Sequence, residues 1–342
     1  MFNPSSFFRL MATPALLLSM AGVCPARNHA RILQTNSNGD NIHIIDPATN
    51  KVVGEITGIK MSHGIAVAPD GKRIYISNES SSTLDVVDGT TLKVIKQIPL
   101  SARPNNIALD RQGQHVYVGI RQEPGGIDVI DTASLSNTKT IVTGSTIHNP
   151  YVTPDGKYLI AAAIQAKRIE VIDLKTGQVL EPIQMDLGPR PLAISKNPDG
   201  STHWIFVQLS GLNGFAVVDF ATRKEIKRIL HPDLPPGRSP VDPGTEISHG
   251  MAVTPDQKTL LICSRINAAL YSYSLPELKV TGTAYLGGKG SAWISLTPDV
   301  RRAYVANTLT DDVSVVDLKS MKEIARIHVG SVPKRNTLGM LP

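Results

Sequence analysis

The sequence predicts an all-β fold, a seven-bladed β-propeller with four antiparallel strands in each blade. A short phrase, clearest as His-Gly-Ile-Ala-Val-x-Pro-Asp-Gly, recurs seven times along the 342 residues. Each full copy is followed by runs of β-branched and aromatic residues, and the two ends of the chain carry complementary parts of one repeat. A repeat of roughly 40–45 residues that holds several short strands is typical of a propeller blade.

The copies of this phrase are evenly spaced, with one exception. Their starts are separated by about 42, 43, 43, 58, 43 and 43 residues. The copies occupy residues 63–71, 105–113, 148–156, 191–200, 249–257 and 292–300, with a degenerate last copy at 335–342. The long interval contains residues 231–248, a proline-rich insertion that predicts an irregular loop beside the channel. This loop could act as a partial lid, and the alternative is a decorative insertion with no role in the site.

Within one repeat the residues predict four strands in order. In the first full copy the apolar residues 65–67 form the first strand, which ends at a Pro-Asp-Gly turn. Residues 73–77 form the second strand and residues 84–88 the third, since both runs are rich in strand-forming side chains. Residues 93–98 are more polar and predict the outer edge. One such sheet cannot cover both of its faces, so the repeats must stack on each other.

The two ends of the chain predict how the ring closes. Residues 31–57 contain the second, third and fourth strands of a repeat but lack the first. Residues 335–342 supply only a first strand. Together they predict one composite blade, which with six whole repeats makes seven.

The repeats resemble the YVTN family of seven-bladed propellers, which includes surface-layer-type proteins. The resemblance rests on residues 303–307 (AYVAN), residues 313–317 (VSVVD) and the recurring His-Gly-Ile-Ala-Val phrase, and it extends over residues 31–342. It implies the fold and leaves the activity open, because one propeller architecture serves many functions.

The first residues predict a secretion signal. Arg9 precedes an apolar stretch that is too short for a comfortable membrane span, and small residues follow it. We place the signal at residues 1–26 and a single propeller domain at residues 27–342; cleavage after Ala21 or Ala30 and a lipid anchor at Cys24 are alternatives. Cleavage after residue 26 would leave Cys263 as the one cysteine, so no disulfide is expected. The expected location is the periplasm or the exterior.

The charge balance indicates the kind of partner. Lys and Arg number 35 against 29 Asp and Glu, a net charge of +6. This mild excess favours a small anionic molecule, or a protein partner, at the channel rim. No continuous basic run supports specific recognition of nucleic acid, and no further membrane segment is apparent.

Three histidines recur at the start of the first strand in alternate repeats. Taken round the ring, this position holds His63, Asn105, His148, Pro191, His249, Ala292 and either Arg335 or Asn336. Three imidazoles that converge on a channel mouth could bind zinc, copper or iron, and Glu246 of the insertion could be a further ligand or base. The alternative is that these histidines only bond water or backbone.

Arginines form a second recurring pattern. Arg103 and Arg190 precede the first strands of the second and fourth repeats, whereas Arg121 and Arg265 follow second strands. Glu79 occupies that latter position in the first repeat. The guanidinium fork suits carboxylate or phosphate, so these residues, with Asn105, are candidates for binding an anion. The alternative is that they bond neighbouring blades.

Two functions of different classes remain open. The first is an exported binding or scaffold protein that acts through its channel rim. The second is a metal-dependent enzyme, an oxidoreductase or a lactonase- or lyase-like enzyme, with a three-histidine site for a small anionic substrate. The sequence contains no phosphate-binding loop, dinucleotide fingerprint or haem-attachment motif.

Overall fold

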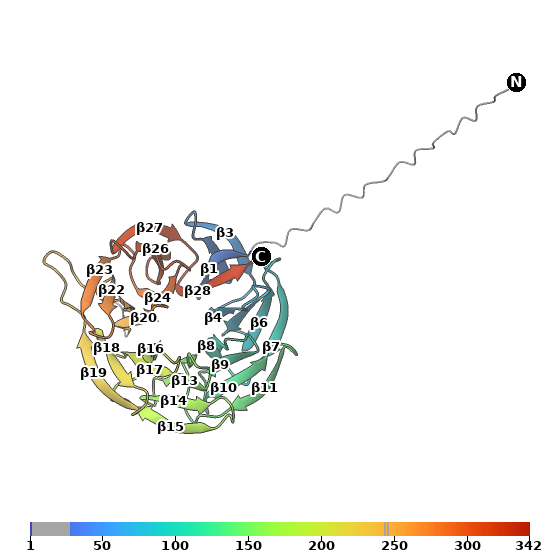
Figure 1. Ribbon diagram of the computed structural model, residues 1–342, viewed down its shortest axis with the longest axis horizontal. Helices are drawn as coiled ribbons and strands as arrows, with labels where there is room; N and C mark the ends of the chain where they lie inside the picture. Colours follow the sequence, from blue (N-terminus) through green and yellow to red (C-terminus); the bar gives the residue numbers. More distant parts are fainter. Residues whose placement is uncertain (2–27, 243, 245) are drawn as a thin grey trace.

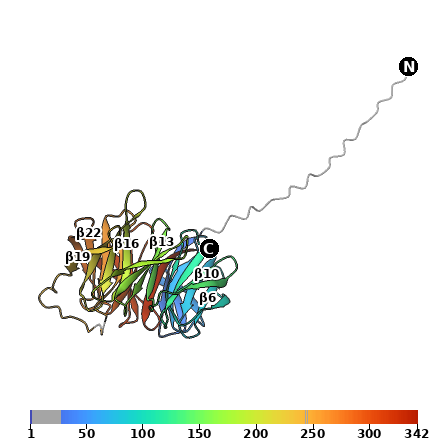
Figure 2. The ribbon, with the colours of Figure 1, turned by 90° about the horizontal axis from the view of Figure 1, so that it is seen from below.

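The computed structural model describes residues 1, 28–242, 244 and 246–342. Within these residues every regular element is a strand, and the strands form seven four-stranded antiparallel sheets. The sheets stand side by side around a central axis, as Figure 1 shows from above and Figure 2 from the side. The predicted seven-bladed propeller is therefore confirmed.

Each whole blade runs from an inner strand at the channel to an outer strand at the rim of the disc (Figure 1). Blade one comprises β4 (Ser62–Val67), β5 (Arg73–Asn78), β6 (Thr83–Asp88) and β7 (Val94–Pro99). Blade two comprises β8 (Pro104–Leu109), β9 (His115–Ile120), β10 (Gly126–Asp131) and β11 (Ser136–Ile141). Blade three comprises β12 (Asn149–Val152), β13 (Tyr158–Ala163), β14 (Arg168–Asp173) and β15 (Val179–Gln184).

The remaining whole blades follow the same order. Blade four comprises β16 (Pro189–Lys196), β17 (Thr202–Leu209), β18 (Gly214–Asp219) and β19 (Lys224–Leu230). Blade five comprises β20 (Ser248–Val253), β21 (Thr259–Ser264), β22 (Ala269–Ser274) and β23 (Val280–Tyr285). Blade six comprises β24 (Ser291–Leu296), β25 (Arg302–Asn307), β26 (Asp312–Asp317) and β27 (Lys322–His328).

The composite blade closes the ring as predicted. Its strand order is β28 (Pro333–Leu341), β1 (His29–Asn36), β2 (Asn41–Asp46) and β3 (Lys51–Thr57). The C-terminal strand is the innermost one, and it pairs with β1 in an antiparallel register that sets Leu338 opposite Ile32. The first and the last strand are thus held in one sheet by backbone hydrogen bonds.

The hydrophobic core consists of seven clusters, one at each interface between neighbouring blades. Between blades one and two, for example, Tyr75 and Leu84 pack against Val116 and Val118, and all four are almost fully buried. Alternation along each strand directs these apolar side chains to both faces of a sheet, where the adjacent sheet covers them. The ring therefore needs every blade in place to bury its core.

The described part of the insertion, residues 231–242, 244 and 246–248, does not form the predicted lid along its whole length. Its middle projects outward beside β23 (Figure 1), where the Arg238 guanidinium lies 4.4 Å from the centre of the Tyr285 ring. Val241 donates a backbone hydrogen bond of 2.7 Å to Ile266. Contacts with β23 and with the connection between β21 and β22 hold this part of the loop. Glu246, near the end of the insertion, reaches the channel.

The predicted signal peptide lies outside the described residues apart from Met1. Within the described part of the chain, no helix has the length and apolar character needed to cross a membrane.

Candidate functional site

Strand pairing fixes which residues share one level of the channel. In blade one, Ile65 of the inner strand lies opposite Ile76, and His63 comes two residues before Ile65. The equivalent pairs, Leu192 with Val207 in blade four and Asn336 with Gln34 in the composite blade, place Arg190 and Lys334 at the histidine position. The seven residues at this level, here called the mouth ring, are His63, Asn105, His148, Arg190, His249, Ala292 and Lys334.

Two positions of the predicted ring were therefore wrong. Pro191 and the pair Arg335 or Asn336 each lie one or two residues beyond the correct register. In blade four both β16 and β17 have 8 residues rather than the 6 of β4 and β5, so the turn motif is no guide to the channel end. The tail lacks a Pro-Asp-Gly turn altogether, and only its pairing with β1 sets its register.

The three histidines of the mouth ring do meet. The ring centres of His63 and His148 lie 6.3 Å apart, and those of His148 and His249 lie 6.4 Å apart, both in edge-to-face arrangements. His63 is 3% exposed and His249 is 1% exposed. The predicted convergence of residues from blades one, three and five is thus present.

Each of these imidazoles has its Nδ1 atom engaged by a neighbour. His63 Nδ1 lies 2.5 Å from Glu79 Oε1, and His249 Nδ1 lies 2.6 Å from the carbonyl oxygen of Ala292. The Nδ1 atom of His148 bonds the side chain of Asn149. A carbonyl can only accept, so His249 carries its proton on Nδ1 and its Nε2 atom bears the lone pair. This Nε2 atom is buried and has no hydrogen-bond partner among the described residues.

Burial keeps these imidazoles neutral. It lowers the pKa of His63 to about 4, even though the hydrogen bond to Glu79 acts in the opposite direction. It lowers the pKa of His249 to about 3 and that of His148 well below the ordinary value. A positive charge on a buried imidazole would lose much of its hydration, so the neutral form is preferred at pH 7.

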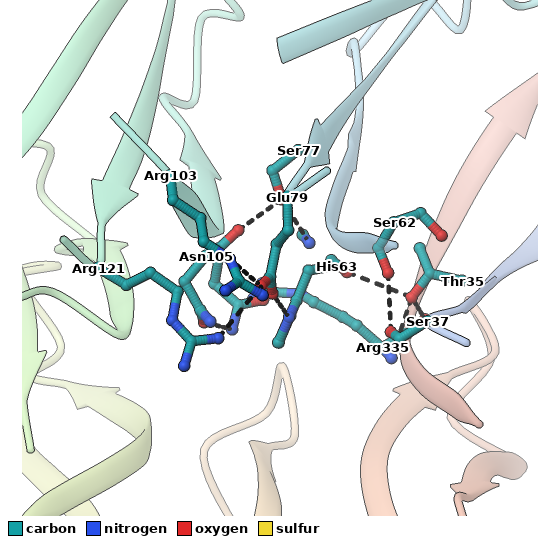
Figure 3. Close-up of polar contacts among 12 residues, drawn as sticks. Thr35, Ser37, Ser62, His63, Ser77, Glu79, Arg103, Asn105, Arg121 and Arg335 are labelled. Atoms are coloured by element: carbon teal, nitrogen blue, oxygen red, sulfur yellow. Dashed lines mark hydrogen bonds and ion pairs between the residues drawn. The ribbon is translucent and has the colours of Figure 1, made fainter. Parts of the chain in front are cut away.

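Glu79 is the centre of a first carboxylate cluster, shown in Figure 3. Besides His63, its carboxylate contacts Arg103 at 2.8 Å and Arg121 at 3.1 Å, both from blade two. Burial raises the pKa of Glu79, but the contacts with His63, Arg121 and Arg103 outweigh it and lower the pKa to about 2. The carboxylate is therefore ionised, and it joins blades one and two.

Glu246 is the centre of a second cluster on the other side of the histidines. Its carboxylate lies 3.1 Å from Arg190 and 3.8 Å from Arg265, and 3.9 Å from Nε2 of His249. Burial raises the pKa of Glu246, and the neighbouring His249, Lys334, Arg265 and Arg190 together bring it well below the ordinary value. The predicted Glu246 thus reaches the mouth, although as an ion-pair partner.

Positive charge exceeds negative charge around the mouth. Six cations, Arg103, Arg121, Arg190, Arg265, Lys334 and Arg335, face two carboxylates, Glu79 and Glu246, a difference of 6 − 2 = 4. Lys334 stands close enough to lower the pKa of all three histidines. Among the described residues no carboxylate forms an ion pair with Lys334 or Arg335.

Arg335 follows Lys334 of the mouth ring on β28 and contacts residues of two other blades. Its guanidinium lies 4.2 Å from the centre of the Trp293 ring, and its Nη1 atom donates to the Asn106 side chain of blade two. Blade one contributes Gly64 at the corresponding position, and the backbone of Gly64 lies close to that of Asn106. Burial lowers the pKa of Arg335 to about 10, which leaves it charged at pH 7.

The remaining predicted residue, Asn105, also belongs to the mouth ring. Its Oδ1 atom accepts a 3.0 Å hydrogen bond from Asn106, and its Nδ2 atom is buried without a partner. Within residues 28–242 and 246–342, no three or more His, Cys, Asp or Glu side chains are arranged to hold a metal ion. A shared metal would require the three imidazoles to approach each other.

Sequence reasoning missed Lys334, Trp293 and Asn106 as members of the site. Lys334 follows from the register of the composite blade, which the sequence alone leaves open. The contacts of Arg335 with Trp293 and Asn106 join the composite blade to blades six and two. Repeat spacing does not indicate when a side chain extends beyond the adjacent blade.

Comparison with known structures shows the same fold. A Kuenenia stuttgartiensis hydrazine synthase chain is 22% identical with a TM-score of 0.72, over 89% of this chain and 99% of the other. The Pseudomonas aeruginosa periplasmic gluconolactonase is 18% identical with a TM-score of 0.71, over 92% and 100%. A dihydro-heme d1 dehydrogenase is 15% identical with a TM-score of 0.63, over 87% and 63%. No curated protein matches the sequence significantly.

A family assignment comes from the sequence of the N-terminal blades. Residues 25–196, just over half of the chain, match the family described as the Cytochrome D1 heme domain. This match includes His63, His148, Glu79 and the arginines that bind Glu79. The chain therefore belongs to the Cytochrome D1 heme domain family of seven-bladed propellers.

Proposed function

We propose that this chain is an exported binding protein whose channel mouth takes a small anion. The observation that carries the proposal is the excess of four positive charges around the mouth ring, with Lys334 and Arg335 lacking a carboxylate partner among the described residues. Charges in a site shielded from water interact more strongly than at an open surface. An anion that enters the mouth supplies the missing negative charge.

The carboxylate clusters prepare this site. Glu79 and Glu246 each hold two guanidinium groups in place, so the arginines are fixed before a ligand arrives. Arg103 and Arg121 keep about two-fifths of their side chains exposed, at 43% each, and so face an incoming molecule. Fixed donors lose little entropy on binding, which favours affinity for an anion.

Export is part of the same proposal. The apolar stretch after Arg9 supports a secretion signal at residues 1–26, and the Pseudomonas relative is described as periplasmic. The YVTN resemblance of the repeats is compatible with this reading and remains a proposal about ancestry.

The family description raises the question whether the mouth holds a haem. Iron in a haem takes an imidazole nitrogen, and the buried, unpartnered Nε2 atom of His249 is a suitable donor. The macrocycle, however, needs a flat slot beside that nitrogen. Here the three imidazoles lie against each other at 6.3 and 6.4 Å, and Trp293 lies 6.0 Å from His249. The side chains in this arrangement do not fit a tetrapyrrole.

A metal-dependent enzyme is the second candidate, and one observation favours it. All three imidazoles have Nδ1 engaged, the arrangement in which metal-binding histidines present Nε2 to an ion. A divalent ion held by His63, His148 and His249, with Glu246 nearby, would polarise a small anionic substrate oriented by the arginines. Metal analysis of the purified chain, before and after His148→Ala, tests this candidate.

The anion proposal is tested by calorimetric titration of the purified chain with sulfate and with small carboxylates. We expect binding that weakens as salt rises, and at least a tenfold loss in Lys334→Ala. Lys72→Ala, at an exposed turn between β4 and β5, is the matched control and should leave affinity unchanged. If neither sulfate nor any of the carboxylates binds, the proposal is overturned.

A further inference from the structure

We propose that the ligand of the channel mouth is a small hydroxycarboxylate, whose hydroxyl groups donate to channel histidines while its carboxylate binds Arg335. This inference rests on the proposed anion site and specifies its chemistry. Two separate sets of atoms carry it: imidazole nitrogens that can only accept, and a guanidinium edge that can only donate.

The acceptors are the Nε2 atoms of His63 and His249. His249 directs its Nδ1 hydrogen to the Ala292 carbonyl at 2.6 Å, which leaves Nε2 with a lone pair and no hydrogen-bond partner. His63 directs Nδ1 to Glu79 at 2.5 Å, a carboxylate held ionised by two arginines, so its Nε2 is likewise an acceptor. A bare anionic oxygen would repel these lone pairs, whereas a hydroxyl group donates to them.

The donor edge belongs to Arg335. Trp293 covers one face of its guanidinium, and Asn106 takes its Nη1 atom. The Nε atom is buried without a partner, and no hydrogen bond from Nη2 to a described residue is found. Nε and Nη2 lie side by side in a guanidinium, and this edge matches the two oxygens of a planar carboxylate.

The two sets of atoms lie close to each other. The Trp293 ring links the two sets, because its centre lies 4.2 Å from the Arg335 guanidinium and 6.0 Å from the centre of the His249 ring. Asn106, which accepts a hydrogen bond from Arg335, also donates one to Asn105 of the mouth ring. One small molecule can therefore touch both sets. An alkyl carboxylate satisfies Arg335 but leaves the buried Nε2 atom of His249 unpaired. A neutral polyol satisfies the histidines but leaves the cations without a counter-charge. Buried polar groups left unpaired are costly, so the site should discriminate against both.

The experiment compares D-gluconate with hexanoate, which has the same six-carbon chain without hydroxyl groups. Calorimetry on the purified chain at constant ionic strength should show gluconate binding at least tenfold more tightly than hexanoate. His249→Phe removes the Nε2 acceptor and should reduce this preference to threefold or less while hexanoate affinity stays the same. Arg335→Gln should weaken both ligands at least tenfold. Arg301→Gln, whose side chain is 83% exposed, is the control and should change neither.

The outcomes separate this inference from the anion proposal. Equal binding of gluconate and hexanoate, or a preference that survives in both His63→Phe and His249→Phe, overturns the hydroxyl contact but leaves the anion site standing. Binding of sulfate but not of gluconate would likewise overturn the hydroxyl contact and leave the anion site standing. No binding of sulfate, hexanoate or gluconate overturns both. Arg335→Lys provides a folded alternative to Arg335→Gln: it keeps the charge but lacks the fork, so it should weaken gluconate more than sulfate.

Discussion

Glu79 accepts the Nδ1 hydrogen of His63 across 2.5 Å, and the same carboxylate binds Arg103 and Arg121 of the next blade. One side chain thus sets the tautomer of a channel imidazole, neutralises part of two guanidinium groups and joins two sheets. Glu79 therefore has a structural role between two blades and a role in the charge of the mouth. A substitution that removes the charge of Glu79 should change both roles, one seen in the free energy of unfolding and the other in anion affinity.

Glu79→Gln should destabilise the fold and at the same time strengthen anion binding. The amide keeps the shape but leaves two arginines without their counter-charge, which should lower the free energy of unfolding by about 1–3 kcal/mol. The site becomes more positive by one unit, so sulfate should bind more tightly. Urea denaturation and calorimetry measure the two effects. Glu55→Gln is the control, because Glu55 is 44% exposed, accepts a hydrogen bond from Asn41 that an amide can also accept, and makes only a long 3.9 Å contact with His43. Unchanged stability in Glu79→Gln would show that its ion pairs contribute nothing.

Repeat spacing alone predicted the blades, their order and the composite closure, because every blade repeats the same strand and turn chemistry. Spacing also brought His63, His148 and His249 to one level, as the structure has them. It failed at Arg190 and Lys334, where longer strands or a missing turn motif shift the register. The Arg335 contacts with Trp293 and Asn106 were beyond its reach, because they depend on how far a long side chain extends across neighbouring blades.

Acid should destabilise the protein well before its carboxylates take up protons. Burial lowers the pKa of His63 to about 4 and those of His231 and His249 to about 3, against 6.5 in the unfolded chain. Between these values the unfolded state binds protons that the folded state does not. The free energy of unfolding should therefore be steady above pH 7 and fall from pH 6.5 towards pH 4.

Urea denaturation at pH 7.5, 6.5, 5.5 and 4.5 measures this dependence. His231 is the informative position, because it lies outside the mouth ring, stacked on Tyr271 at 4.5 Å. His231→Phe removes one titrating group, so it should reduce the slope of the unfolding free energy against pH by about 1.4 kcal/mol per pH unit. Equal stability at pH 7.5 and pH 4.5 would contradict the assignment of neutral buried imidazoles.

Closure of the ring should depend on the last strand. Leu341 of β28 is 5% exposed and packs in the cluster between the composite blade and blade one, whereas the adjacent Met340 is 40% exposed. Leu341→Ala should cost about 2–4 kcal/mol of unfolding free energy, because it leaves a cavity in that cluster. Met340→Ala should cost less than about 0.5 kcal/mol. Chemical denaturation of both variants measures the difference, and equal values would mean that the tail does not seal the ring.

Gly64→Ala should affect both the stability of the fold and the position of the groups around Arg335. A Cβ atom at Gly64 would lie 2.7 Å from the Ile107 nitrogen and 2.9 Å from the Asn106 Cα atom, so the backbone of blade two would have to move. Forcing such a contact costs about 1–3 kcal/mol. The displaced backbone carries Asn106, the partner of Arg335, so anion affinity should fall together with stability. Gly39→Ala is the matched control, since its Cβ atom would meet nothing closer than 3.5 Å. If Gly64→Ala and Gly39→Ala bind sulfate equally well, the close approach of blades one and two does not position Arg335.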